Sequence, residues 1–178
     1  RHQILKGEDI MEVVKPVKRN VLLNPGPATT SDAVKYAQVI PDICPREQEF
    51  VDIMTGVRKD LVKVVHGDPE KYTAVIFTGS GTIIQDVLVN SLVPEGKKIC
   101  VVNNGAYAAR MVEIAEYYKI ECVDIQSSTT GLPDLDAVKK AIEADKDIAV
   151  VAAVHHETGT GVLNPIKEIG QIAHDNDC

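Results

Sequence analysis

The chain has 178 residues, of which 44% are hydrophobic, so it can fold around a core as one domain or as a large piece of one. Its formal net charge is −7, with both signs interspersed and no basic stripe, which argues against a nucleic-acid partner. The longest apolar run, residues 148–154, is too short to span a bilayer, and we find no signal-peptide pattern. The sequence therefore predicts a protein without a membrane partner.

The cysteines are too widely spaced for a zinc or CxxC pattern, and the chain is too long for a disulfide scaffold. We therefore expect no metal site and a reduced, cytoplasmic setting. Cys100 and Cys122 fall in strand-like runs and are predicted to be small buried hydrophobic residues. The other two are Cys44 and Cys178.

The first segment, residues 1–20, is polar with mixed charge and is interpreted as an arm or linker. Asn24-Pro25-Gly26-Pro27 then predicts an irregular turn, because two prolines around a glycine exclude a helix. Thr30 or Ser31 is expected to cap a short helix towards Val39. Because the chain starts at Arg and ends directly after a helical pattern, we expect a piece of something longer.

Residues 49–65 carry apolar side chains at helical spacing, which predicts a helix with one buried face, ended by Gly67-Asp68-Pro69. From there strand and helix patterns alternate, which predicts a parallel sheet covered by helices on both faces. Asp134 is a candidate N-cap, and Pro165 is placed to open the last helix. The expected strands are 74–77, 98–102, 121–125 and 148–154, and the expected helices are 82–92, 106–118, 134–144 and 165–175.

Three polar segments follow strand patterns, and the carboxyl ends of parallel strands form the ligand crevice of an open sheet. The first, Gly79-Ser80-Gly81-Thr82, is either a phosphate site at a helix N-terminus or a common strand–helix connector. The second contains Tyr107, which either stacks on a flat phosphorylated ligand or packs on the sheet.

The third polar segment, residues 155–161, contains imidazoles and hydroxyls. His155 and His156 would point to opposite sides if the strand continued through them, so one is interpreted as structural. Glu157 either orients a histidine or caps a turn. Thr158 and Thr160 either bond a ligand oxygen or satisfy the loop backbone.

Taken together, these motifs resemble those of the class V aminotransferases, which use pyridoxal 5′-phosphate (PLP) on the fold-type-I scaffold. Within that family the resemblance is to the branch that acts on 2-aminoethylphosphonate and pyruvate. It covers residues 21–178 in the family's order. The motifs are Asn24-Pro25-Gly26-Pro27-Ala28-Thr29-Thr30, Gly79-Ser80-Gly81-Thr82, Asn104-Gly105-Ala106-Tyr107 with Arg110-Met111, and His156-Glu157-Thr158-Gly159-Thr160-Gly161 with Leu163-Asn164-Pro165-Ile166.

The resemblance implies the N-terminal part of a three-layer α/β large domain with a mostly parallel sheet. Ser80, Gly81 and Thr82 would hold the PLP phosphate. Tyr107 would stack on the pyridine ring, and Thr158 would bond the ring oxygen. Asn24, Pro25 and Gly26 would line the substrate side. A homodimer that transfers an amino group from 2-aminoethylphosphonate to pyruvate, giving phosphonoacetaldehyde and alanine, is the implied activity.

The sequence departs from the family in what it lacks, because no lysine here has the context of the lysine that bonds PLP. The resemblance places that lysine, the aspartate that pairs with the pyridine nitrogen, and the small C-terminal domain beyond Cys178. No catalytic residue is therefore assigned within this chain. In some relatives the transaminase follows a nucleotidyltransferase domain, and residues 1–20 would be the tail of such a partner.

Two kinds of alternative remain open at this stage. The same fold serves other class V reactions, such as alanine–glyoxylate or serine–pyruvate transamination and cysteine desulfuration. The second alternative is a nucleotide-binding module that is not an enzyme. It is disfavoured because the turn at Gly79–Thr82 is neither G-x-G-x-x-G nor a Walker loop.

Overall fold

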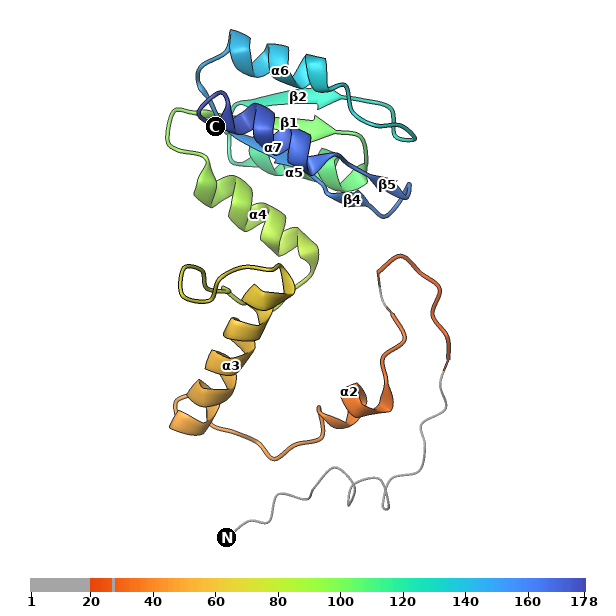
Figure 1. Ribbon diagram of the computed structural model, residues 1–178, viewed down its shortest axis with the longest axis vertical. Coiled ribbons are helices and arrows are strands. Elements are labelled where there is room, and N and C mark those ends of the chain that lie inside the picture. Colours follow the sequence, from red (N-terminus) through yellow and green to blue (C-terminus); the bar gives the residue numbers. More distant parts are fainter. Residues whose placement is uncertain (1–19, 27) are drawn as a thin grey trace. The chain divides into compact units, whose positions relative to one another are not determined.

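The computed structural model describes residues 20–26 and 28–178, and Figure 1 shows the order of the elements. The chain divides into two compact units, one ending at Val75 and the other beginning at Ile76. The expected arm over residues 1–20 lies, except for Asn20, outside the described residues, and so does Pro27. None of the helices in the described part is long and apolar enough to span a bilayer.

The first unit begins with the predicted turn. Leu23 and Ala28 form an isolated antiparallel bridge, and Gly26 lies between them at φ +141°, a conformation that favours glycine. The Thr29 hydroxyl oxygen accepts a hydrogen bond from the Leu22 amide at 2.8 Å, which ties the two arms of the turn together. The irregular turn expected from the prolines is therefore confirmed.

Two helices follow in this unit. Helix α2 (Asp32–Tyr36) is capped by Ser31, whose side-chain oxygen accepts from the Val34 amide at 3.4 Å. Of the two candidate caps it is therefore Ser31 that caps the helix. Helix α3 (Gln48–Val64) ends close to the predicted position, just before Gly67.

The predicted buried face of α3 is wrong. Val62 is buried, but Ile53, Val57 and Leu61 are each more than 40% exposed. Amphipathic spacing shows which face of a helix can be buried, and burial still requires a partner surface within the same compact unit. In the unit that ends at Val75, that face of α3 stays exposed to solvent.

The second unit is a three-layer α/β arrangement built on a parallel sheet (Figure 1). Its strands lie in the order β2-β1-β3, and both neighbours of β1 run parallel to it. A short antiparallel hairpin, β4 and β5, follows β3. The strands are β1 (Lys98–Asn103), β2 (Cys122–Gln126), β3 (Ile148–Ala153), β4 (His156–Glu157) and β5 (Val162–Leu163), and the helices are α4 (Gly81–Leu92), α5 (Ala106–Tyr117), α6 (Leu135–Ala144) and α7 (Ile166–His174).

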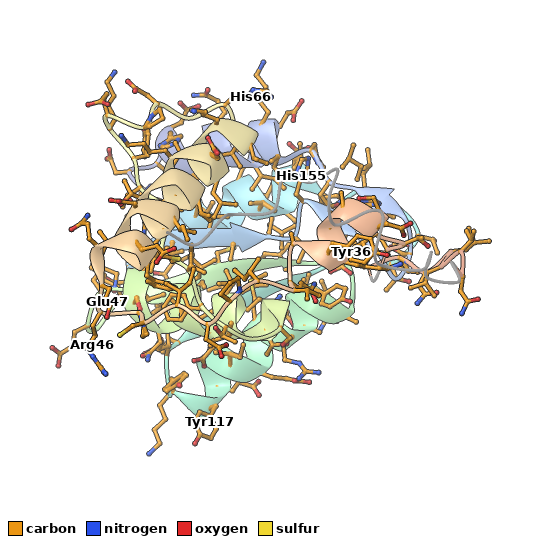
Figure 2. The ribbon with its side chains drawn as sticks, turned by 90° about the horizontal axis from the view of Figure 1, so that it is seen from below. Tyr36, Arg46, Glu47, His66, Tyr117 and His155 are labelled. Carbon is orange, nitrogen blue, oxygen red and sulfur yellow. The ribbon has the colours of Figure 1, made fainter. Side chains whose placement is uncertain are left out.

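Helices cover both faces of the sheet, as the uninterrupted apolar strands predicted. Ile99 and Val101 of β1 pack with α4 and α5, whereas Cys100 and Val102 pack with α6 and α7 on the opposite face. Alternate side chains of a strand point to opposite faces, so a central strand between two helical layers is apolar at every position. Helix α5 ends at Tyr117, which is labelled in Figure 2. Its ring packs edge-on against that of Tyr118, with 5.2 Å between the centroids.

The predicted strand at residues 74–77 is wrong, because these residues form no strand. Val75 is 69% exposed and Phe77 is 42% exposed. A strand needs a neighbour to satisfy its backbone N–H and C=O groups, and here the sheet of the second unit consists of β2, β1 and β3 alone. Apolar β-type composition was therefore insufficient to form this element.

The cysteine predictions are confirmed for Cys100, which is fully buried on the face covered by α6 and α7, while Cys122 is partly buried on the opposite face, against the cluster with α4 and α5. Burial raises the pKa of the Cys100 thiol to about 12. Burial likewise raises the pKa of Cys122 to about 11. Both thiols therefore stay protonated at neutral pH and behave as apolar side chains.

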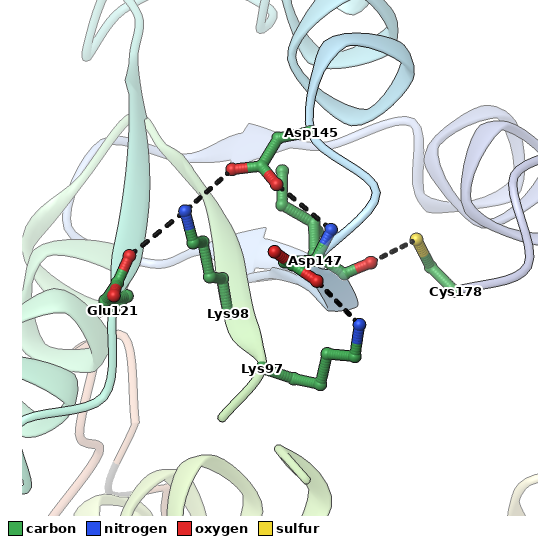
Figure 3. Close-up of polar contacts among 7 residues, drawn as sticks. Lys97, Lys98, Glu121, Asp145, Asp147 and Cys178 are labelled. Atoms are coloured by element: carbon green, nitrogen blue, oxygen red, sulfur yellow. Dashed lines mark hydrogen bonds and ion pairs between the residues drawn. The ribbon is translucent and has the colours of Figure 1, made fainter. Parts of the chain in front are cut away.

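Ion pairs join the strands at the amino ends of the sheet (Figure 3). The Lys98 Nζ atom lies 3.0 Å from Asp145 Oδ2 and 3.0 Å from Glu121 Oε2. Lys97 Nζ lies 2.7 Å from Asp147 Oδ1. The bond from Lys98 lowers the pKa of Asp145. These contacts lie at the end opposite the polar loops, so they support the sheet rather than the candidate site.

Candidate functional site

The N-terminus of α4 is open to an anion. Ser80 is its N-cap and makes no side-chain capping bond, and Ser80, Gly81 and Thr82 are all exposed. A Cβ added at Gly81 would meet nothing within 4 Å. The first amides of a helix have no partner within the helix, and the helix dipole favours negative charge there. Two hydroxyls, free amides and an open approach therefore fit the phosphate of PLP.

Tyr107 is the second residue of α5, and the residue is 48% exposed, which argues against the core-packing alternative. The Gln85 side chain of α4 donates a hydrogen bond from Nε2 to the Tyr107 carbonyl oxygen at 2.8 Å. Val89 of α4 also packs against α5 in the same apolar cluster. These contacts bring the start of α5, with Tyr107, next to the helix that carries the predicted phosphate site.

The loop after β3 folds back onto the same helix. Glu157 of β4 is 1% exposed, and its Oε1 accepts a hydrogen bond from the Ala108 amide at 3.2 Å. Thr158 follows directly and is partly buried. Of the two interpretations of Glu157, neither is correct. Its carboxylate caps a helix that begins 51 residues earlier, at Ala106, and no local sequence signal indicates so distant a partner.

A buried amide pair, which the sequence did not reveal, fastens the hairpin to the end of β1. Asn104 Nδ2 donates to Asn164 Oδ1 at 2.8 Å, and Asn164 Nδ2 donates back to Asn104 Oδ1 at 3.0 Å. Asn164 Nδ2 also donates to the Val154 carbonyl oxygen at 2.8 Å. Both residues precede Gly or Pro, so in sequence they indicated turns. Only the fold pairs them.

The histidines contribute to the hairpin through their backbones: the His155 carbonyl oxygen accepts from the Asn164 amide at 2.8 Å, and His156 pairs with Leu163. Strand β3 ends at Ala153, before His155 and His156, and both are exposed, so the premise of a continuing strand does not hold. The Thr160 hydroxyl donates to the Glu157 carbonyl oxygen at 3.3 Å and so satisfies the loop backbone. Among the described residues, no three His, Cys, Asp or Glu side chains gather as metal ligands would.

A hollow of about 320 Å³ lies where the loops after β1, β2 and β4 meet. None of the predicted cofactor residues lines it, although Ala106 beside Tyr107 does. Asn24, Pro25 and Gly26 lie in the first unit, and their role on the substrate side stays a prediction. The hollow is lined by Asn103, Gly105, Ala106, Ala109, Gln126, Ser127, Thr129 and Thr160.

Comparison with known protein families decides which family this fold belongs to. The family model described as aminotransferase class-V matches residues 31–178. The chain belongs to the class V aminotransferases. Enzymes of this family depend on PLP, and the open N-terminus of α4 fits the phosphate of that cofactor. Family membership also removes the support for a non-enzymatic nucleotide-binding module.

Curated relatives of this class V aminotransferase chain are longer than it is. A Bacillus cereus 2-aminoethylphosphonate–pyruvate transaminase is 38% identical over 149 residues, which cover 84% of this chain and 43% of that protein. A bifunctional phosphonoacetaldehyde hydrolase/aminoethylphosphonate transaminase of Clostridioides difficile is 34% identical over 171 residues, 96% of this chain and 27% of that protein. The chain thus spans less than half the length of these relatives.

Solved structures confirm the fold class. Pyridoxamine-pyruvate aminotransferase from Mesorhizobium loti is similar with a TM-score of 0.81 at 20% identity, over 91% of this chain and 41% of that chain. Alanine–glyoxylate aminotransferase from Nostoc sp. gives a TM-score of 0.80 at 23% identity, over 92% of this chain and 42% of that chain. At these identities the likeness shows the fold-type-I architecture alone.

Proposed function

We propose that the full-length protein transfers the amino group of 2-aminoethylphosphonate to pyruvate, giving phosphonoacetaldehyde and alanine. The observation that carries this proposal is the similarity to transaminases named for that reaction. Three of them are 36–38% identical to this chain over 84–88% of its length. The proposal keeps the homodimeric assembly implied by the resemblance and the reduced, cytoplasmic setting expected from the cysteine spacing.

The residues of this chain have binding roles in the proposal. Ser80, Gly81 and Thr82 hold the PLP phosphate at the open start of α4. Tyr107, which is half-exposed, covers the pyridine ring, and Thr158 bonds the ring oxygen. When bound, PLP supplies an electron sink for the carbon that carries the amino group.

Two roles remain: lining the substrate side, and the covalent and proton-transfer chemistry of the lysine. The turn at residues 24–26 lines the substrate side. The proposal assigns covalent attachment of PLP and movement of the substrate proton to a lysine beyond Cys178, so this chain contributes binding and orientation.

A panel of amino donors tests the reaction. Purified full-length protein is loaded with PLP and offered 2-aminoethylphosphonate, alanine, serine or cysteine, with pyruvate or glyoxylate as acceptor. We expect the highest kcat/KM for 2-aminoethylphosphonate with pyruvate and formation of phosphonoacetaldehyde and alanine in equal amounts. A clear preference for alanine, serine or cysteine as donor would contradict the proposal and favour another class V reaction.

A further inference from the structure

Glu157 contacts two segments that the proposed function needs in fixed positions. Its carboxylate Oε1 accepts the Ala108 amide at 3.2 Å, in the first turn of α5. The N-cap of that helix is Gly105, which has no side chain for capping. A residue from the β4–β5 hairpin therefore takes over the capping role. Because Tyr107 lies between Gly105 and Ala108, this bond fixes the turn that carries it.

The backbone of Glu157 organises the hairpin as well. Its carbonyl oxygen accepts hydrogen bonds from the Gly161 amide at 2.7 Å and the Thr160 amide at 3.1 Å. These bonds close the loop that contains Thr158. One residue therefore anchors both the loop with Thr158 and the helical turn with Tyr107.

The Glu157 carboxylate lies so close to Gly105 that this position has no space for a side chain. The Gly105 φ of −177° is extended backbone that any residue adopts, so its conformation does not require glycine. A Cβ at this position, however, would lie 2.5 Å from Glu157 Oε2 and 2.8 Å from Cγ. The glycine therefore makes room for the carboxylate. Within the described part of the chain Oε2 is buried and has no hydrogen-bond partner, so the bond from the Ala108 amide to Oε1 is the one that holds the carboxylate.

We propose that Glu157 is a positioning residue that holds Tyr107 and Thr158 in a fixed relation to each other, so that both engage the ring of the same PLP molecule. The proposal rests on the proposed cofactor site and adds to it a residue that touches neither the cofactor nor the substrate. It also assigns Gly105 as the necessary partner of Glu157.

The test uses full-length protein and measures the PLP dissociation constant, the visible circular dichroism of bound PLP, and the melting temperature without cofactor. Glu157→Ala is expected to weaken PLP binding about tenfold and to reduce the dichroic band, because the stacking ring loses its fixed position. Glu157→Gln keeps the volume and one acceptor oxygen, so it is expected to retain most of both signals.

Asp134→Ala is the matched control. The Asp134 carboxylate caps α6 through the Ala137 amide at 3.1 Å, in the same manner, on a helix that carries no predicted site residue. This variant is expected to lower the melting temperature and to leave PLP binding and its dichroic band unchanged. The comparison separates positioning from general loss of a helix cap.

Gly105→Ala perturbs the same contact from the other side. It is expected to reproduce the cofactor phenotype of Glu157→Ala, and the double variant is expected to be no worse than Glu157→Ala alone, because removing the side chain removes the clash. If Glu157→Ala does not fold, Gly105→Ala alone decides the question.

Wild-type affinity and dichroism in Glu157→Ala, or in Gly105→Ala, would overturn the positioning role. Additive losses in the double variant would overturn the pairing of the two residues. Wild-type protein that binds no PLP would overturn the proposed function together with this inference, so the two failures are distinguishable.

Discussion

If the N-terminus of α4 binds the PLP phosphate, removing its two hydroxyls should lower the affinity for PLP and leave the stability of the fold nearly unchanged. The double variant Ser80→Ala with Thr82→Ala removes both hydroxyls and leaves the backbone amides in place. A hydrogen bond to a charged group contributes about 1.5–3 kcal/mol, so two such bonds contribute about 3–6 kcal/mol. Since 1.4 kcal/mol is about a factor of ten, PLP affinity should fall by about 10²–10⁴.

Stability should change little in the same variant. The Ser80 hydroxyl makes no capping bond, and both side chains are exposed, so no buried group loses a partner. Surface substitutions of this kind change the free energy of unfolding by about 0.5 kcal/mol or less. Ser31→Ala is the contrasting control, since Ser31 does cap its helix and is expected to cost about 1 kcal/mol without a loss of PLP affinity.

The assay is equilibrium binding of PLP to cofactor-free full-length protein, with thermal melting of the cofactor-free protein alongside. Weaker binding at an unchanged melting temperature supports phosphate binding by these hydroxyls. Unchanged PLP affinity in the double variant would refute the assignment. A fall in melting temperature of the cofactor-free protein would instead show that the hydroxyls support the fold, which would contradict the reasoning from exposure.

Three further predictions follow from the described contacts. Tyr107→Ala should weaken PLP binding and shift the cofactor absorbance, whereas Tyr107→Phe keeps the ring; normal binding with a lower melting temperature would contradict stacking. Asn164→Ala should cost about 1–3 kcal/mol by denaturant unfolding, because the buried Asn104 loses both hydrogen bonds with Asn164; an unchanged midpoint would contradict this. Lys98 lowers the pKa of Asp145, so the ionised carboxylate stabilises the fold above its ordinary pKa of 3.8, and this stabilisation is lost as the pH falls through the lowered value. In Lys98→Met, the melting temperature should therefore fall less steeply as the pH is lowered below about 4. The same steepness as in the wild type would contradict a stabilising ion pair.

Local sequence determined the elements whose partners lie nearby in the chain. The strands at Lys98–Asn103 and Ile148–Ala153 and the helix at Ala106–Tyr117 lie within a residue or two of their predicted bounds. Asp134 caps α6 as predicted, through the Ala137 amide. Hydrophobic periodicity and capping residues act within a few positions, so one sequence is enough to locate them.

The sequence also located two polar segments of the candidate site correctly at the starts of helices, although the strand predicted before the first of them does not form. Ser80 is the N-cap of α4, and Tyr107 lies in the first turn of α5. Their roles in PLP binding stay predictions. Pattern alone left Tyr107 between stacking and core packing, and its 48% exposure required the packed structure, because exposure depends on what the rest of the chain covers.

Tertiary structure alone decided the features that depend on a distant partner. Residues 74–77 have strand composition but no neighbouring strand, and α3 has an apolar face but no surface to bury it against in its unit. Conversely, Glu157 and Asn164 looked like loop residues and are buried. Their partners, the Ala108 amide and Asn104, lie 49 and 60 positions away. Hydrogen bonds offset much of the free-energy cost of burying a polar side chain, and the folded chain determines where those partners lie.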